Sequence, residues 1–209
     1  MMDGVGLFEE ACALISAGGG ANLMRGVELM RQAADAGHPS AANNFGTFLH
    51  SGRGVHKDLT GARAYYGQAA AVGLPVACFN LGYMWLHGLG GRQDVAAARS
   101  LFERAAHGGE RDAMNLLGAM FMTGQGGPQD FDAGREWWMR GVALGDGRCA
   151  FNLGIACVRG QWGETDFVEA WRWFKQAESL GNAAAAKELE RLHCVMTDDE
   201  RRQILRPTG

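Results

Sequence analysis

The chain has 209 residues, a formal net charge of −3 and 47% hydrophobic residues, so it can bury a core and is not expected to be disordered. It has no cluster of Lys and Arg, so we expect no nucleic-acid partner. It also lacks a run of about 18 apolar residues, so we expect no membrane span. The start, MMDGVGLFEE, lacks the basic segment of a signal peptide, which favours a cytoplasmic protein.

The five cysteines are odd in number, and no Cys-x-x-Cys occurs. This pattern predicts reduced, mostly buried thiols and not a disulfide framework or a zinc site. The cysteines are Cys12, Cys78, Cys149, Cys157 and Cys194.

Residues 4–39 form the first and weakest unit of an internal repeat. Its second half keeps the register of later units, and Asn22 is expected to begin the second helix. Its first half is out of phase, because Glu9 and Glu10 stand where later units have Leu-Gly or Phe-Gly. Terminal repeats are commonly atypical because one face meets water.

Four further units follow without insertion, at a period of 36 residues. The ends of the first helices recur as Gly52, Gly88, Gly124 and Gly160. The expected N-caps of the second helices recur as Asp58, Asp94, Asp130 and Asp166. The glycines that end the second helices are Gly37, Gly73, Gly109, Gly145 and Gly181. The units therefore span about 40–75, 76–111, 112–147 and 148–183.

Residues 184–206 are expected to form two capping helices, the second opening with a capping box from Thr197 to Glu200. A helix pair cannot bury its apolar face alone, but stacked pairs bury a continuous core. The sequence therefore predicts an all-α protein, a right-handed α-solenoid in a single domain over residues 1–209.

The spacing A-x-x-N-L-G-x-x-Y-x-x-G-x-G-V-x-x-D resembles that of Sel1-like repeats, relatives of tetratricopeptide repeats, over residues 4–183. Leu116 and Trp162 depart from the Asn and Gly columns, which puts the local loop geometry in question. The resemblance implies an adaptor that holds other proteins together. A cysteine-rich branch joins the two helices of each unit by disulfides, but no second helix here contains a cysteine.

Taken alone, the segment HGLGGRQD at 87–94 could hold a phosphate. Phosphate loops lead into a helix whose N-terminus faces the anion, and here Asp94 would repel it. We therefore interpret these glycines as a turn. His50 and His87 have no second metal ligand at helical spacing, and no G-x-S-x-G or S-x-x-K occurs, so we expect no metal, no cofactor and no enzyme activity.

First helices line the inner surface of such superhelices, and polar columns recur on them. Because an amide both donates and accepts, the asparagines could clamp an extended peptide, or they could bond only between neighbouring repeats. The predicted partner-binding residues on these helices are Asn44, Thr47, Asn80, Tyr83, His87, Asn152, Ile155 and Arg159.

Other side chains leave two interpretations open. Trp171 replaces Arg63, Arg99 and Arg135 in its column, so it is a further candidate for the interface, although packing in the core is an alternative. Met84, Met120 and Met122 could form an adaptable apolar wall or fill the core.

We therefore expect a non-enzymatic adaptor that binds a protein or peptide on its concave surface, in bacterial-type signalling or regulation. One alternative is an immunity protein that inhibits a secreted toxin through the same surface. Another is a β-lactam-binding hydrolase, as the cysteine-rich branch of the family implies.

Overall fold

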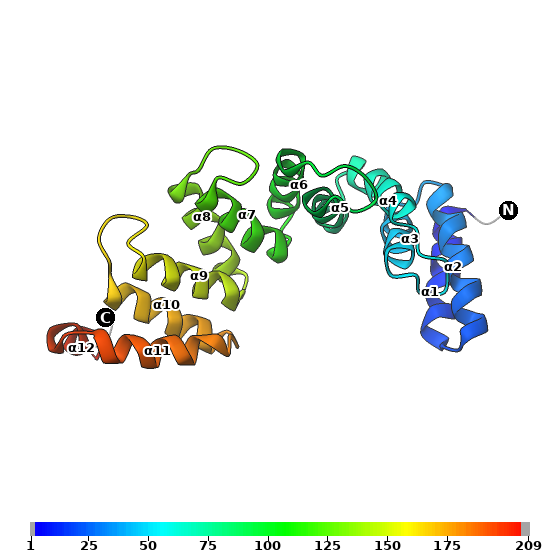
Figure 1. Ribbon diagram of the computed structural model, residues 1–209. Coiled ribbons are helices and arrows are strands. Elements are labelled where there is room, and N and C mark those ends of the chain that lie inside the picture. The colour runs from blue at the N-terminus through cyan, green and yellow to red at the C-terminus, as the bar shows by residue number, and fades with distance from the viewer. Residues whose placement is uncertain (1–2, 206–209) are drawn as a thin grey trace. The chain divides into compact units, whose positions relative to one another are not determined.

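The computed structural model describes residues 3–205, and that range contains twelve α-helices and no β-strand (Figure 1). The all-α class and the helix-pair repeat are thereby confirmed. The helices are α1 Gly4–Ala17, α2 Gly20–Asp35, α3 Pro39–Ser51, α4 Leu59–Ala71, α5 Pro75–His87, α6 Val95–His107, α7 Arg111–Thr123, α8 Phe131–Ala143, α9 Gly147–Val158, α10 Phe167–Ser179, α11 Ala184–Val195 and α12 Asp198–Ile204.

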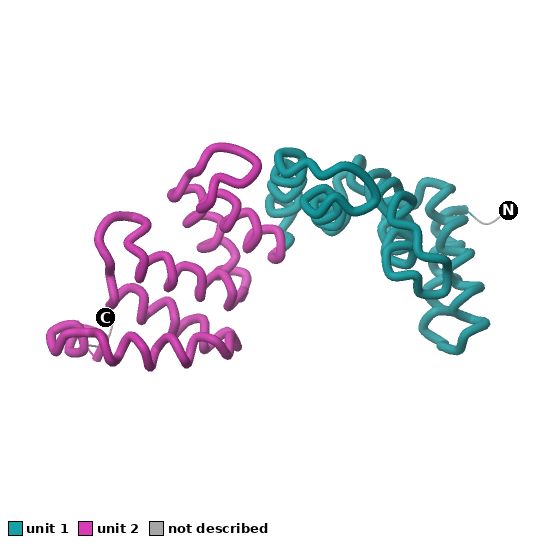
Figure 2. The backbone as a smooth tube through the Cα atoms, viewed as in Figure 1, with its two compact units in different colours: residues 1–110 teal, residues 111–209 magenta. Residues whose placement is uncertain are grey.

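The helices form two compact units, residues 1–110 and 111–209 (Figure 2). In the first unit, α1 packs on α2, α3 on α4 and α5 on α6, and α2·α3 and α4·α5 contacts stack the pairs. In the second unit, α7 packs on α8 and α9 on α10, and α11 and α12 both contact α10. None of the helices described is long and apolar enough to cross a membrane.

The helix boundaries lie where the recurring residues predict them. The four recurrent aspartates each accept a hydrogen bond at 2.8–2.9 Å from the backbone N–H three residues later, which caps the second helix. The glycines that follow the second helices have φ between 83° and 88°, a conformation that other residues rarely adopt. The predicted capping box of α12 is present, although Arg206 lies outside the described residues.

The first repeat corrects one prediction. Asn22 does not cap α2, because that helix begins at Gly20 and its N-cap is Gly19, which provides no side-chain bond. Here the loop between the paired helices is only Gly18–Gly19, whereas residues 52–58 join α3 to α4. The helices of the first pair therefore extend into positions that a loop occupies elsewhere, and Ala11, fully buried, faces α2 at Gly26.

A glycine in the first helix of each later pair lets an aromatic ring of the second helix approach its backbone. A Cβ added to Gly46 would lie 2.9 Å from the ring of Tyr66, and one added to Gly118 would overlap the indole of Trp138. The same contact occurs at Gly82 with Phe102 and at Gly154 with Phe174. These rings are buried and form the centre of each pair.

Trp162, which stands where the other repeats have glycine, makes a specific contact in its loop. In the third repeat, Gly90 lies against the backbone carbonyl of Leu59, at the start of the preceding second helix. Trp162 stands in the same column, and its indole N–H donates to the corresponding carbonyl, that of Phe131, at 3.0 Å. This loop thus contacts the preceding repeat through a side chain, whereas the loop of the third repeat does so through the backbone of Gly90.

The contact between Gly118 and Trp138 is testable by adding one methyl group. We expect Gly118→Ala to lower the free energy of unfolding by about 1–3 kcal/mol, because the methyl overpacks against a rigid ring. In the control Gly67→Ala, nothing lies within 4 Å of the new Cβ, and alanine in a helix should stabilise by roughly 0.5–1 kcal/mol. Urea unfolding followed by circular dichroism compares them, and an unchanged Gly118 variant would contradict the close approach.

Candidate functional site

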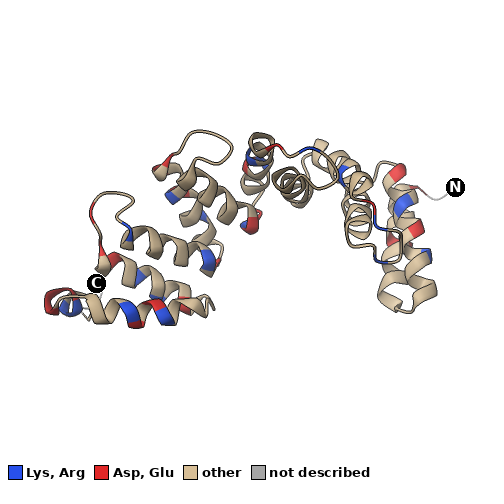
Figure 3. Ribbon diagram, in the orientation of Figure 1, with Lys and Arg blue, Asp and Glu red and all other residues tan. Residues whose placement is uncertain are grey.

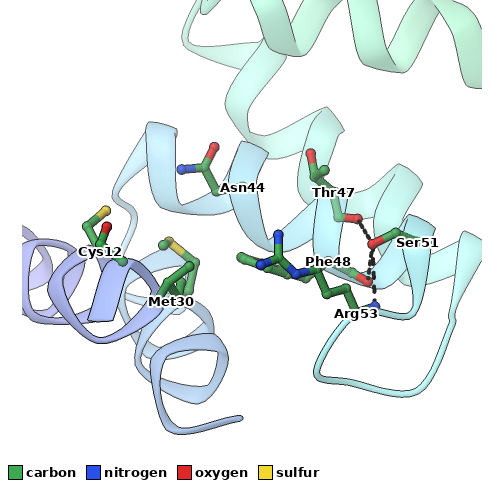
Figure 4. A pocket seen from close by; sticks show the side chains of 9 residues that line it. Cys12, Met30, Asn44, Thr47, Phe48, Ser51 and Arg53 are labelled. Atoms are coloured by element: carbon green, nitrogen blue, oxygen red, sulfur yellow. Dashed lines mark hydrogen bonds between the residues drawn. The ribbon is translucent and has the colours of Figure 1, made fainter. Parts of the chain in front are cut away.

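A pocket of about 500 Å³ opens between α1 and α3 in the first unit (Figure 4). Its volume falls within the range of small-ligand pockets, roughly 300–1,000 Å³. Two predicted partner-binding residues, Asn44 and Thr47, line it. The full lining consists of Cys12, Ile15 and Ser16 from α1, Met30 from α2, Asn44, Thr47, Phe48 and Ser51 from α3, and Arg53 from the loop that follows.

The pocket lies where the first repeat lacks an aromatic ring. Met30 is the counterpart of the ring residues Tyr66 and Phe102, which follow it by one and two periods of 36 residues. Those rings fill the space beside the glycines of the later first helices. Met30 is 1% exposed, so it lies buried beneath the pocket at the position where the later repeats have a ring.

Hydrogen bonds use most of the polar groups on the α3 side of the pocket. The Thr47 hydroxyl lies 3.2 Å from the carbonyl oxygen of Asn43 and 3.1 Å from the Tyr66 hydroxyl. The Ser51 hydroxyl donates to the carbonyl of Thr47 at 2.9 Å (Figure 4). Asn44 Oδ1 accepts from Asn43 Nδ2 at 3.3 Å, while Asn44 Nδ2 donates to no group among residues 3–205. The Asn44 amide N–H is therefore available to an occupant.

Two of the predicted asparagines bond to neighbouring repeats. Asn80 Nδ2 donates to Asn43 Oδ1 at 2.9 Å, and Asn152 Nδ2 donates to Asn115 Oδ1 at 2.8 Å. Asn43 is 7% exposed, so the acceptor of this bond is buried, while Asn80 is half-buried. These contacts match the alternative in which the amides link repeats.

The acceptors Asn43 and Asn115 were not among the predicted site residues. A signal for them exists in the sequence, because the position before the asparagine column alternates between Asn and Phe with a period of two repeats. The phenylalanines, Phe79 and Phe151, pack on rings of their own second helices, with centroids 5.7 and 5.4 Å apart. The column thus alternates between polar contacts across repeats and apolar contacts within them.

Exposed predicted residues lie on the next turns of the first helices. Tyr83 is 40% exposed, and its ring lies 4.3 Å from that of His87 on the same helix. Thr47 and Arg159 are also exposed, whereas Ile155 is half-buried against the core of the second unit. Neither α3 nor α5 contains a charged residue, as Figure 3 shows.

Trp171 is half-buried and packs against the core of the second unit. The contacts of the arginines at the same position in earlier repeats explain why the residue type changes here. The Arg63 guanidinium lies 3.5 Å from the ring centre of Trp85 and donates to the carbonyl of Arg92 in the next loop. Arg135 likewise lies over Trp162 in the loop of the next repeat. No such loop follows α10, because α11 is a capping helix.

The three methionines fill the core and do not form an apolar binding wall, because Met84, Met120 and Met122 are at most 4% exposed. The buried thiols of Cys149 and Cys157 are poorly suited to nucleophilic chemistry. Burial raises the pKa of Cys149 to about 12 and that of Cys157 to about 11, so both are protonated near neutral pH. Over the described range, no group of three His, Cys, Asp or Glu side chains is arranged to hold a metal ion.

Comparison with known protein families identifies the repeat. The family model for the Sel1 repeat matches residues 11–38, 39–74, 75–110, 111–146 and 147–182. No match was found among curated protein sequences.

Solved structures share the fold. A protective antigen present in uropathogenic Escherichia coli strains is 27% identical, with a TM-score of 0.78 over 87% of this chain, which spans only 39% of that one. A Sel1 repeat protein from Oxalobacter formigenes is 29% identical, with a TM-score of 0.72 over 86% of this chain and 76% of that one. An immunity protein from Pseudomonas aeruginosa is 20% identical, with a TM-score of 0.53 over 98% of this chain and 76% of that one, a likeness of fold alone.

The bond between Asn80 and Asn43 predicts a structural cost. We expect Asn80→Ala to lower the free energy of unfolding by about 1–2 kcal/mol, because the buried Asn43 oxygen loses its donor. Asn43→Ala with Asn80→Ala should cost less than the sum of the single changes. Chemical unfolding measures all three, with exposed Gln68→Ala as the control; if Asn80→Ala unfolded like that control, the amide would not be structural.

Proposed function

Because the chain belongs to the Sel1 repeat family, we propose that it is a non-enzymatic scaffold that captures a partner protein or peptide on its first helices. The observation that carries this proposal is the surface of α3 and α5. It is uncharged, it exposes Thr47, Ser51, Tyr83 and His87, and it continues into the pocket beside α1. Such a surface suits hydrogen bonding and aromatic contact with a peptide chain.

The polar residues of the first helices fall into a bonded group and an exposed group, which supports the proposed binding surface. Asn80 and Asn152 are bonded to other repeats, so they act by fixing the helices that present the surface. Tyr83 and His87 stand one and two turns further on, where their exposed rings can contact a partner. A tyrosine that is already positioned loses little freedom on binding, which favours its use as an anchor.

A protein partner fits these helices better than a nucleic acid does. Phosphate backbones are bound through Lys and Arg, and α3 and α5 contain neither. Since the sequence has neither G-x-S-x-G nor S-x-x-K, binding without catalysis is favoured over the hydrolase alternative.

Inhibition of a secreted toxin is a second candidate. The observation that favours it is the fold shared with an immunity protein of Pseudomonas aeruginosa. Both candidates use the same surface and differ in the partner. Capture of a toxin, followed by loss of toxin activity, would distinguish inhibition from an adaptor role.

The proposal predicts that capture depends on exposed rings. We expect Tyr83→Ala with His87→Ala to reduce capture of the cross-linked partner from the native host at least about tenfold, because aromatic anchors dominate such interfaces. The melting temperature should stay unchanged, since both side chains are exposed.

The matched control is Met24→Ala with Gln68→Ala, which removes exposed side chains from second helices. This control should capture the partner as the wild type does. If both double variants captured it equally well, the first helices would not be the binding surface.

A further inference from the structure

We propose that the pocket between α1 and α3 binds an acidic segment of a partner protein, with an apolar side chain of that segment inside the pocket and a neighbouring carboxylate on Arg53. The inference rests on the proposed function and specifies the chemistry of the partner at one end of the binding surface. It concerns the first unit alone, since every lining residue lies between Cys12 and Arg53.

The interior of the pocket selects an apolar side chain. Ile15, Met30 and Phe48 supply apolar lining from three different helices. An aliphatic side chain entering there would replace water with dispersion contacts to this apolar lining. Ile15 and Phe48 are half-buried and can contact that side chain, while Met30 lies buried beneath them.

The rim of the pocket selects a negative charge. Arg53 is the one charged residue in the lining, and no carboxylate among residues 3–205 pairs with it. The unused N–H of Asn44 is a second donor beside the same pocket. A carboxylate accepts from both kinds of donor, whereas a lysine of a partner would meet a like charge at Arg53.

These two contacts have different roles. An exposed ion pair adds little binding energy by itself, so the apolar side chain is expected to provide affinity and the carboxylate selectivity. A peptide that carries only one of the two groups should bind more weakly than a peptide with both.

Cys12 provides a direct test because its thiol lines the pocket. The full chain with Cys194→Ser is equilibrated with mixed disulfides of short linkers that carry Leu-Asp, Leu-Asn, Leu-Lys or Gly-Asp amides, at a fixed concentration of 2-mercaptoethanol. Cys194 is replaced because it is exposed, whereas Cys78, Cys149 and Cys157 are buried. Intact mass and peptide mapping give the fraction of Cys12 labelled by each probe.

We expect Leu-Asp to label Cys12 roughly threefold more than Leu-Asn, the contribution of an exposed ion pair, and more than Gly-Asp. Leu-Lys should label least. In Arg53→Glu, the order of Leu-Asp and Leu-Lys should reverse. Equal labelling by all four probes, no labelling of Cys12, or an unchanged order in Arg53→Glu would each overturn the proposal.

A second variant tests the apolar part. Met30→Phe supplies the ring that the later repeats contain, so it should abolish the preference for Leu-Asp over Gly-Asp while circular dichroism shows a folded protein. Retained preference in that folded variant would show that the probes bind elsewhere. These readouts are independent of capture through Tyr83 and His87: failed labelling with intact capture overturns only the pocket, and the reverse result overturns only the wider surface.

Discussion

The contact between a glycine backbone and an aromatic ring sets the spacing within each later helix pair. At Gly46 and Gly118 the first helix offers no side chain, so Tyr66 and Trp138 lie directly against its backbone. Closely paired helices place their remaining side chains at fixed positions toward the next pair. The pocket beside Met30 lies in the first repeat, where a methionine stands at the ring position.

The polar side chains of the first helices form two groups with different tasks. Buried amides must find partners inside the protein, and Asn43 and Asn115 do so through the asparagines of the following repeats. Side chains one or two turns further on, such as Tyr83 and His87, lie outside this arrangement and face solvent. The internal bonds fix the helices, and the exposed rows remain free for recognition.

The period, the helix ends and the caps could be predicted because their causes are local in the sequence. An aspartate caps the helix that it precedes, and a glycine such as Gly73 adopts a positive φ whatever its distant neighbours are. Contacts between repeats could not be predicted in this way. The acceptor of Asn80, the half-buried position of Trp171 and the early start of α2 depend on loop lengths and on which neighbour a side chain reaches.

The alternation of Asn43, Phe79, Asn115 and Phe151 gives the chain a structural module of two repeats, 72 residues long. Removing residues 76–111 would place Leu116 opposite the buried oxygen of Asn43, which then has no donor. Removing residues 76–147 would place Asn152 there and preserve the bond. Deletion of the one repeat that follows Asn43 therefore breaks this buried polar contact, whereas deletion of the two repeats that follow it conserves the contact.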